Sequence, residues 1–535
     1  MIKNKRIFLL LLKVLFIYLL LYMGDFLFSL YNTNYPPANI LHLNLGLYLA
    51  ILSILLFKAF WLRVLLLSGI LTSMLIEYCY YQYFGTFVQP IGFYQILLNT
   101  HETYTVFADE ASSMIVPLLI FLGLLFSIVL LKNMMKIDSL RNNKLALLFL
   151  TLLFLNSLYT THYRLHSSSG KLRHKNAKRI MPLPKIHSSE NYLRALKYFL
   201  IGILPQKILS EDINKFPKLP QLNEKLEQEE NNVIFIIGES LRAKQLGILG
   251  YELQTTPNLA NIDGLYSKSI YSSGTMTKVS VSSLLNRVKY PGSTAQIMQQ
   301  TNNLFNLAKQ HHYKTFFYSW QKDSELTILQ NFIGRKFIDN YASREGVSQK
   351  VHTLDGYDDN LFHILKSIHL DEGNNFIVLH QRGSHAVYED NYPKSFDKFE
   401  KPYDNTVLYA DFLLNEIIQY LKKISKKPTY IVYTSDHGEL LHEHGKNGHG
   451  WFFPEVYKVP FLFYGVNTDI NSSDLKNIQN HFDVSNLIAS FLGYKVTIKN
   501  DEEIYVNGSD VDALAGYLHI QLDENGTEVH IDKIQ

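Results

Sequence analysis

The sequence of 535 residues contains a single cysteine and almost no excess charge. Cys79 alone cannot form an intramolecular disulfide, and no cluster of cysteines is present to bind a metal. Any metal must therefore be bound by carboxylates, imidazoles or hydroxyls. The formal net charge is only +3, and no basic stripe is present, so the sequence gives no indication of a nucleic-acid partner.

Charged residues are also scarce in the first third of the chain, which is rich in Leu, Ile, Phe and Tyr. An apolar run of about 18 or more residues can cross a bilayer as a helix. We predict five such spans, at residues 7–29, 41–60, 64–84, 114–131 and 145–159. Because the whole chain is too long for one ordinary domain, we expect a transmembrane domain over residues 1–161.

The few basic residues of this part indicate its orientation. Cytoplasmic loops carry an excess of Lys and Arg, and three basic residues precede the first span. Lys58 and Arg63 flank the turn between spans two and three, and Lys132, Lys136, Arg141 and Lys144 lie between spans four and five. The N-terminus is therefore expected in the cytoplasm, and five crossings place the rest of the chain outside. In a Gram-negative cell this is the periplasm.

Two segments next to the predicted spans are expected to connect domains. Residues 85–113 mix aromatic and apolar side chains with Glu102, Asp109 and Glu110. They are either a long connection or an amphipathic interfacial helix that meets a lipid headgroup. Residues 162–231 are expected to be a polar linker or bridging segment, which leaves a catalytic domain over residues 232–535.

Apolar β-type runs alternate with helical patterns from residue 232 onward. The runs are VIFIIGE, KTFFYSW, NFIVLHQ, TYIVYTSDH and VPFLFYG. Continuous apolar strands favour an α/β fold with a mostly parallel sheet flanked by helices. In such folds chemistry gathers at the carboxyl ends of the strands. Glu239, Asp436 and His437 follow two of these runs directly.

These three side chains together are typical of a zinc site. Zinc accepts carboxylate oxygen and imidazole nitrogen and usually has four ligands. The fourth ligand is expected among the hydroxyls of residues 272–287, SSGTMTKVSVSSLLNR. A metal would also activate such a hydroxyl as a nucleophile. The alternative interpretation is an ordinary Ser- and Thr-rich start of a helix.

The chain resembles the phosphoethanolamine transferases of the alkaline phosphatase and sulfatase superfamily. The resemblance rests on GESLRAKQLGILGYELQTTPNL, GTMTKVSVSSLL, GSHAVYEDNYP, YDNTVLYADFLLNEII, SDHGE and HGWFFPE, which occur in the family order. It implies a five-helix transmembrane domain and a zinc-binding α/β periplasmic domain of the alkaline phosphatase/sulfatase type. It also implies a multi-pass protein of the bacterial inner membrane.

The resemblance assigns roles to particular residues. It implies that Glu239, Asp436 and His437 bind Zn²⁺ together with Thr277, which is also the nucleophile, with Thr275 as the alternative. His385 and His449 resemble the histidines around the transferred phosphate. Glu102 and Glu110 are candidates for binding the ammonium group of the donor, and Lys278 is a further candidate for binding substrate.

The implied reaction is the transfer of phosphoethanolamine from phosphatidylethanolamine through a covalent adduct on Thr277. The acceptor would be lipid A or another envelope component: the lipopolysaccharide core, a glycan or a protein. Many relatives brace the nucleophile helix with paired cysteines, which are absent here.

Other functions are also open. They are a glycerol-phosphate transferase of the lipoteichoic acid synthase type and a sulfatase or phosphodiesterase-like hydrolase. A catalytically inactive membrane scaffold is a further alternative, although all four proposed ligands are present.

Overall fold

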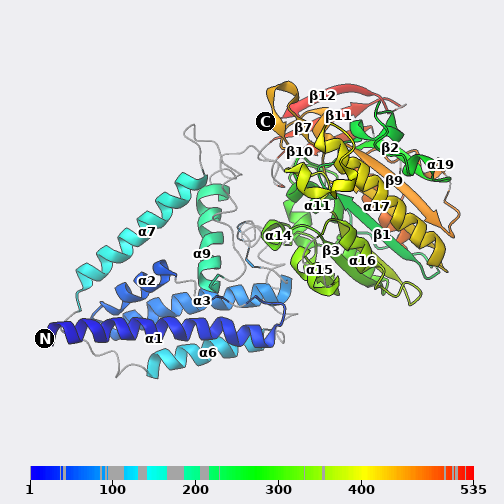
Figure 1. Ribbon diagram of the computed structural model, residues 1–535. Helices are drawn as coiled ribbons and strands as arrows, with labels where there is room; N and C mark the ends of the chain where they lie inside the picture. Colours follow the sequence, from blue (N-terminus) through cyan, green and yellow to red (C-terminus); the bar gives the residue numbers. More distant parts are fainter. Residues whose placement is uncertain are drawn as a thin grey trace. The chain divides into compact units, whose positions relative to one another are not determined.

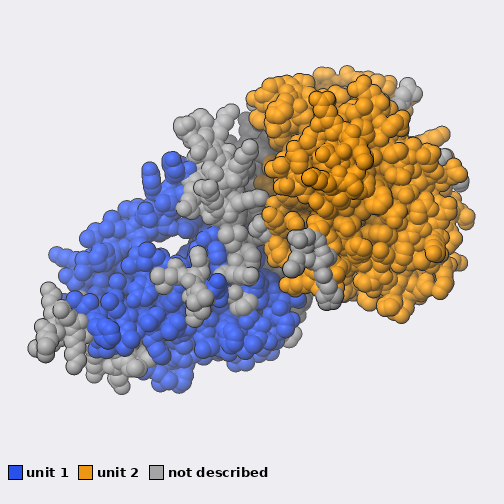
Figure 2. Space-filling model, in the orientation of Figure 1, with its two compact units in different colours: residues 1–211 blue, residues 212–535 orange. Residues whose placement is uncertain are grey.

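The computed structural model consists of two compact units, residues 1–211 and 212–535 (Figure 2). In the first, it describes residues 2–36, 38–39, 44–84, 87–88, 90, 93, 114–130, 141–165 and 186–204. In the second, it describes residues 216–534 except 218, 228, 331, 352–355, 471, 499–501, 509–510, 512–515 and 525. Glu102, Glu110, most of residues 85–113 and, within the predicted linker, residues 166–185 and 205–215 lie outside these residues.

The first unit is built from apolar helices (Figure 1). They are α1 (Ile2–Tyr31), α2 (Leu45–Leu55), α3 (Phe60–Phe84), α6 (Ile115–Leu130), α7 (Asn143–Leu165) and α9 (Ser188–Tyr198), which is followed by a short π-helix (Phe199–Ile203). Leu, Ile and aromatic side chains of α1, α2, α3 and α6 form one buried cluster. Many other large apolar side chains of these helices are exposed, as expected of a surface that faces lipid.

Among the described residues, three helices are long and apolar enough to cross a bilayer: residues 7–31, 60–82 and 143–163. They match the first, third and fifth predicted spans. The second and fourth predicted spans correspond to the shorter helices α2 and α6. Residues 40–43 before α2 and 131–140 after α6 are not described. The structure therefore supports three crossings by length.

The second unit is an α/β domain around a seven-stranded sheet. The strand order is β2 (Tyr266–Tyr271), β9 (Lys458–Val466), β6 (Thr429–Ser435), β1 (Asn232–Gly238), β5 (Asn375–His380), β3 (Lys314–Ser319), β4 (Asn340–Ala342). The strands from β6 to β4 are parallel to one another, whereas β9 pairs antiparallel with β6 and β2. The prediction of a mostly parallel sheet is confirmed.

Alternation along β1 explains how helices cover both faces of this sheet. Val233, Phe235 and Ile237 pack into a cluster with α11 (Thr277–Leu285), α13 (Leu304–Gln310) and α20 (His481–Phe491). Ile234 and Ile236 point to the opposite face and pack against α16 (Asp359–Leu365) and α17 (Pro402–Ile424). Because successive strand residues point to opposite faces, a strand covered on both sides is apolar throughout.

The remaining elements of this unit are short or peripheral. A second sheet contains β10 (Glu503–Asn507), β11 (Tyr517–Leu522) and β12 (Glu528–Ile534), all antiparallel. The others are α12 (Thr294–Gln299), α14 (Asp323–Leu329), α15 (Arg344–Val351), α18 (Pro454–Tyr457), α19 (Ser472–Leu475), β7 (Leu440–Leu441) and β8 (Asn447–Gly448). A bridge between Gly274 and Asn507 joins the second sheet to the turn before α11.

Candidate metal centre

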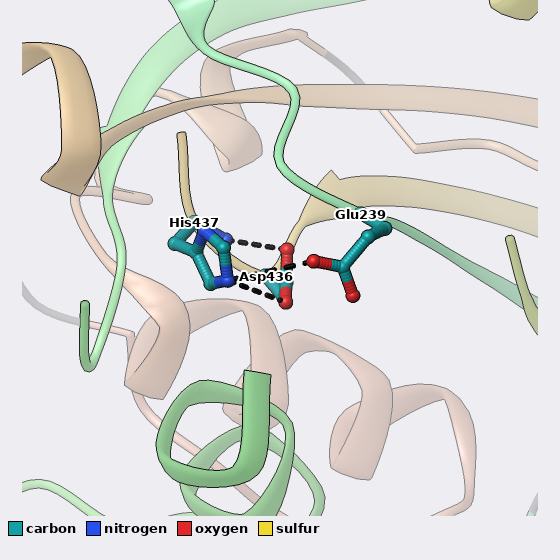
Figure 3. A group of neighbouring side chains, drawn as sticks. All are labelled: Glu239, Asp436 and His437. Atoms are coloured by element: carbon teal, nitrogen blue, oxygen red, sulfur yellow. Dashed lines mark hydrogen bonds and ion pairs between the residues drawn. The ribbon is translucent and has the colours of Figure 1, made fainter. Parts of the chain in front are cut away.

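The three predicted ligands meet because β1 and β6 are neighbouring parallel strands. Gly238 pairs with Ser435 at the last position of the register, so the residues that follow both strands leave the sheet at the same edge. Glu239, Asp436 and His437 are at most 1% exposed. One ligand atom from each lies within 4.8 Å of the others (Figure 3).

The backbone after β1 turns sharply to bring the two strand ends together. Ser240 adopts a left-handed conformation with φ of 57°, which is uncommon for residues other than glycine. In this conformation its N–H donates to Asp436 Oδ1 at 3.0 Å, and its hydroxyl donates to Glu239 Oε1 at 3.0 Å. Ser240 therefore orients both carboxylates.

Thr277, the first residue of α11, lies beside this group. Its Oγ1 is 3.1 Å from both carboxylate oxygens of Glu239 and 3.2 Å from His437 Nε2. The alternative nucleophile, Thr275, is fully buried. The Thr275 hydroxyl has no hydrogen-bond partner within the described part of the chain. The geometry thus brings Thr277, and not Thr275, to the candidate ligands.

The atoms that converge here are nearly all acceptors. His437 Nδ1 lies 2.8 Å from the Gly438 carbonyl oxygen, so Nδ1 carries a proton and Nε2 faces the carboxylates. Nε2 is 3.2 Å from Asp436 Oδ2 and 3.5 Å from Glu239 Oε1. A proton on Nε2 would satisfy one of these contacts. A divalent cation satisfies all of them at once, and the donor set suits zinc.

The electrostatics of the two carboxylates agree with a cation site. Burial, together with the neighbouring Glu239 charge, raises the pKa of Asp436 well above its ordinary value. Burial opposes ionisation of Glu239 too, but the surrounding imidazoles hold the pKa of that carboxyl below its ordinary value. Two carboxylates in one buried site are both ionised only when a nearby positive charge compensates them.

The two predicted phosphate-facing histidines lie on separate loops. The ring of His449 is 4.5 Å from that of His437, centroid to centroid, and its Nδ1 is 3.8 Å from Glu439 Oε1. His385 is half-buried on the loop after β5, and its Nδ1 contacts the Ala386 carbonyl. This loop lies against Glu239, whose carbonyl accepts the Ser384 N–H at 2.9 Å. A Cβ on Gly383 would lie 2.8 Å from that carbonyl oxygen, so glycine permits the close approach.

Glu439 is a residue of the site that the sequence analysis did not single out. Its side chain is 3% exposed, and its Oε2 accepts the Tyr388 hydroxyl at 3.0 Å. Tyr388 belongs to the His385 loop, whereas Oε1 faces His449. Glu439 therefore holds the His385 loop through Tyr388 and lies near His449, and its place in SDHGE was the available signal.

His380 and Gln321 were also missed. His380 is fully buried, and its Nε2 lies 4.0 Å from Glu239 Oε2. Gln321 donates to the same carboxylate oxygen at 3.2 Å. His380 ends β5 and Gln321 follows β3 closely, so the rule that sites form at carboxyl ends of strands could have found them. Lys278 is half-buried in the first turn of α11.

The fold and the site define a class of protein. Residues 231–494 match the sulfatase family, and this part of the chain is a sulfatase-family domain. Curated relatives are phosphoethanolamine transferases. The chain is 27% identical to Kdo(2)-lipid A phosphoethanolamine 7''-transferase of Escherichia coli over 303 residues, 50% of this chain and 52% of that protein. It is 25% identical to phosphoethanolamine transferase EptA of Helicobacter pylori over 442 residues, 76% and 77% of the two chains.

Solved structures of similar proteins include the integral membrane lipooligosaccharide phosphoethanolamine transferase A of Neisseria meningitidis. It is 16% identical, with a TM-score of 0.45, and the match covers 90% of this chain and 95% of that one. A zinc complex of the periplasmic domain of EptC from Escherichia coli is 22% identical, with a TM-score of 0.43 and coverage of 52% and 87%. The chain spans about half the length of the first curated relatives it matches.

Proposed function

We propose that the protein is a zinc-dependent phosphoethanolamine transferase that uses phosphatidylethanolamine as donor and lipid A or another envelope molecule as acceptor. The names of the curated relatives support the reaction class, and a similar structure is described as a zinc complex. The observation that carries the proposal is the position of Thr277 Oγ1, within 3.2 Å of both Glu239 and His437.

Thr277 Oγ1 is the nucleophile in this proposal. It forms a bond to the headgroup phosphorus while the bond from phosphorus to the diacylglycerol oxygen breaks. Diacylglycerol leaves with a proton, and Thr277 carries phosphoethanolamine. A hydroxyl or phosphate oxygen of the acceptor then attacks the same phosphorus, and the threonine hydroxyl is restored. Covalent catalysis of this kind splits one difficult transfer into two easier ones.

Zinc would be bound by Glu239, Asp436, His437 and Thr277. When bound, the ion supplies positive charge that makes the Thr277 hydroxyl more acidic and offsets charge on the phosphoryl oxygens. His385 and His449 would donate hydrogen bonds to those oxygens, and one of them would protonate the leaving diacylglycerol. Glu439 would orient both histidines through Tyr388 and through its own contact with His449.

The membrane unit fits a lipid donor. We propose five crossings over residues 1–161, a bridging segment over 162–231 and a catalytic domain over 232–535 in the periplasm, with the N-terminus in the cytoplasm. Three helices of sufficient length support this arrangement. Glu102 and Glu110 remain proposed ligands for the donor ammonium, and Lys278 remains a proposed substrate-binding residue at the start of α11.

Mass spectrometry of the tryptic peptide that contains Thr277 tests the proposal directly. Full-length protein is purified from membranes that contain phosphatidylethanolamine. We expect a phosphoethanolamine adduct on Thr277 that is absent in Thr277→Ala. Thr275→Val is the matched control, because it removes a buried hydroxyl that has no partner within the described part of the chain, and it is expected to keep the adduct.

The other outcomes distinguish the alternatives. A glycerol-phosphate adduct would assign the protein to the lipoteichoic acid synthase type of transferase. Release of phosphoethanolamine to water, with no labelled envelope acceptor, would indicate a hydrolase. Absence of both adduct and release, with zinc bound and labelled donor supplied, would contradict catalysis altogether.

A further inference from the structure

Residues 272–276, which we call the nucleophile turn, connect β2 to Thr277. The position of Thr277 relative to Glu239 and His437 depends on this turn, because Thr277 is the first residue of α11. The only cysteine of the chain is Cys79, so no disulfide fixes the turn. Other contacts must therefore hold it against the strand end that carries Asp436 and His437.

His481, the first residue of α20, contacts both parts. Its Nδ1 accepts the backbone N–H of Ser273 at 3.1 Å, and the Ser273 hydroxyl lies 3.2 Å from the same nitrogen. Its Nε2 lies 3.0 Å from the carbonyl oxygen of Ser435, the residue before Asp436. One imidazole thus spans the distance between the nucleophile turn and the end of β6.

The partners of the two ring nitrogens fix the tautomer. A carbonyl oxygen only accepts hydrogen bonds, so Nε2 carries the proton toward Ser435. A backbone N–H only donates, so Nδ1 is unprotonated toward Ser273. His481 is fully buried, and burial lowers its pKa to about 3, although the Ser435 carbonyl raises it. The ring is therefore a neutral connector with a defined direction.

Ser435 passes the connection on to the candidate ligands. Its hydroxyl donates to the His437 carbonyl at 3.0 Å and accepts the Leu241 N–H at 2.8 Å. Leu241 is two residues after Glu239. The strand end that His481 contacts is thus hydrogen-bonded to the backbone beside all three candidate ligands.

We propose that His481 is a positioning residue that sets the distance between Thr277 and the Glu239–Asp436–His437 group by linking Ser273 to Ser435. This inference rests on the proposed function. His481 touches neither the reacting atoms nor a candidate ligand side chain, and it acts through the two backbone groups. A displacement of about 1 Å in reacting groups can slow a reaction by about 100-fold, so a single link of this kind can matter to the rate.

Asn507 provides further described support of the turn. Its N–H donates to the Ser273 carbonyl at 3.0 Å, and its own carbonyl accepts the Thr275 N–H at 3.0 Å. These bonds tie the turn to β10 and not to β6. The Tyr457 carbonyl also accepts the Ser272 N–H at 2.8 Å, and the Thr275 carbonyl accepts the Gly450 N–H at 2.9 Å. Loss of His481 would therefore leave the turn attached to these elements but would remove its described hydrogen-bonded link to the end of β6.

Two variants test the contacts of His481 with Ser273 and with Ser435 separately, and we call them the half-variants. His481→Asn retains an acceptor near the position of Nδ1 but loses the bond to Ser435. His481→Gln retains a donor near the position of Nε2 but loses the bond to Ser273. Val484→Ala is the matched control, since Val484 is a fully buried residue of the same helix and belongs to the apolar cluster.

The measurements use full-length protein in detergent micelles with labelled phosphatidylethanolamine. In both half-variants we expect adduct formation on Thr277 to be about 10- to 100-fold slower, with the donor KM changed by about twofold or less. Hydrogen–deuterium exchange of the peptide covering residues 266–285 is expected to be faster in both half-variants and unchanged in Val484→Ala.

Exchange and catalysis separate the two proposals. The wild-type protein could form no adduct on Thr277 while the nucleophile turn exchanges faster in both half-variants. This result would support the structural role of His481 and would reject the proposed function. A normal adduct rate and normal exchange in either half-variant would overturn the role of His481. Equal effects in Val484→Ala and the half-variants would show that His481 is only a core residue.

Discussion

Asp25 in the helical unit and Asp436 in the α/β unit are both buried carboxylates, but their surroundings differ. In the helical unit, Asp25 is 1% exposed and faces donors: the hydroxyls of Tyr78 at 2.8 Å and Tyr35 at 3.4 Å, and the Ser188 N–H at 3.1 Å. In the α/β unit, Glu239 and Asp436 also accept hydrogen bonds, from the Ser240 hydroxyl, from Gln321 and from two backbone N–H groups. However, the two carboxylates share one buried site, and Asp436 Oδ2 has no hydrogen-bond partner among the described residues. A cation would satisfy this arrangement, whereas Asp25 already has donors around it.

This difference distinguishes a carboxylate whose partners are hydrogen-bond donors of its own unit from a candidate metal ligand. Asp25 accepts the N–H of the first residue of α9, so it serves the N-terminus of that helix from α1. Its hydrogen bonds account for its burial, as is usual for buried polar groups. Asp436 Oδ2 accepts no hydrogen bond among the described residues. Burial and the Glu239 charge raise the pKa of Asp436, so a compensating positive charge is needed before this carboxyl is ionised.

The largest effect is expected for the nucleophile. Thr277→Val preserves the side-chain shape but removes the hydroxyl, so adduct formation and transfer should fall by at least about 1,000-fold. Quantitative mass spectrometry of the Thr277 peptide, with transfer of labelled phosphoethanolamine, measures this. Retention of transfer above about a tenth of the wild-type rate would show that the acceptor-rich site does not work through Thr277.

Zinc binding provides the next test of the comparison. Asp436→Asn removes one ligand charge, and we expect the zinc affinity to fall by at least about 100-fold. Asp25→Asn should leave the affinity unchanged. Competition with a chromophoric chelator measures both. Zinc removal from wild-type protein should also lower its thermal stability, by about 4 kcal/mol if zinc had been at about 1,000 times its Kd. Equal zinc affinity of Asp436→Asn and Asp25→Asn would show that Asp436 is not a zinc ligand.

Asp358 is an intermediate case, because it is buried but accepts two backbone N–H groups, from Arg382 and Gly383. Burial outweighs these bonds and raises the pKa of Asp358 to about 6 from an ordinary value of 3.8. The folded state therefore binds its proton more tightly than the unfolded state. Stability is highest below about pH 4 for this group and is lost as the pH rises to about 6, by about 3 kcal/mol.

Denaturant unfolding at several pH values checks the Asp358 prediction. Asp358→Asn should remove this part of the pH dependence and should flatten the stability profile between about pH 4 and pH 6. A profile in the variant that matches the wild type would mean that folding does not raise the pKa of Asp358.

The smallest effect is expected for the donor-rich carboxylate. Asp25→Asn replaces an acceptor that faces three donors with an amide, and we expect a loss of about 2 kcal/mol in unfolding free energy. Thermal unfolding in detergent, monitored by loss of helical signal, measures the change. Tyr78→Phe removes only the 2.8 Å bond and should cost about 1 kcal/mol. An Asp25→Asn variant with wild-type stability but lowered zinc affinity would show that Asp25 serves zinc binding and not the stability of the helical unit.

Much of the second unit was predictable from local patterns. The five apolar runs correspond to β1, β3, β5, β6 and β9, because a strand covered on both faces leaves a continuous apolar signature. The three candidate ligands could be found because each follows such a run directly. The antiparallel direction of β9 was not predictable, since an apolar run carries no information on its partner strand.

The helical unit was less predictable in detail. The apolar run at residues 41–60 predicts a full span, whereas α2 ends at Leu55 and is followed by a turn that ends before α3 begins at Phe60. Hydropathy measures the apolar composition of a window and not its backbone conformation. Leu56 and Phe57 are apolar and buried in the helical cluster, but they do not continue the helix.

The sequence by itself determined which elements form and which side chains could bind a metal, because these depend on apolar periodicity and on chemistry within a few residues. Only the tertiary structure decided the environment of each polar group. Ser273 and His481 are 208 residues apart, and Thr277 and His437 are 160 apart. Whether a buried carboxylate meets only donors, as Asp25 does, or also a second carboxylate, as Asp436 does, follows from strand order and helix packing, which bring distant residues within hydrogen-bonding distance.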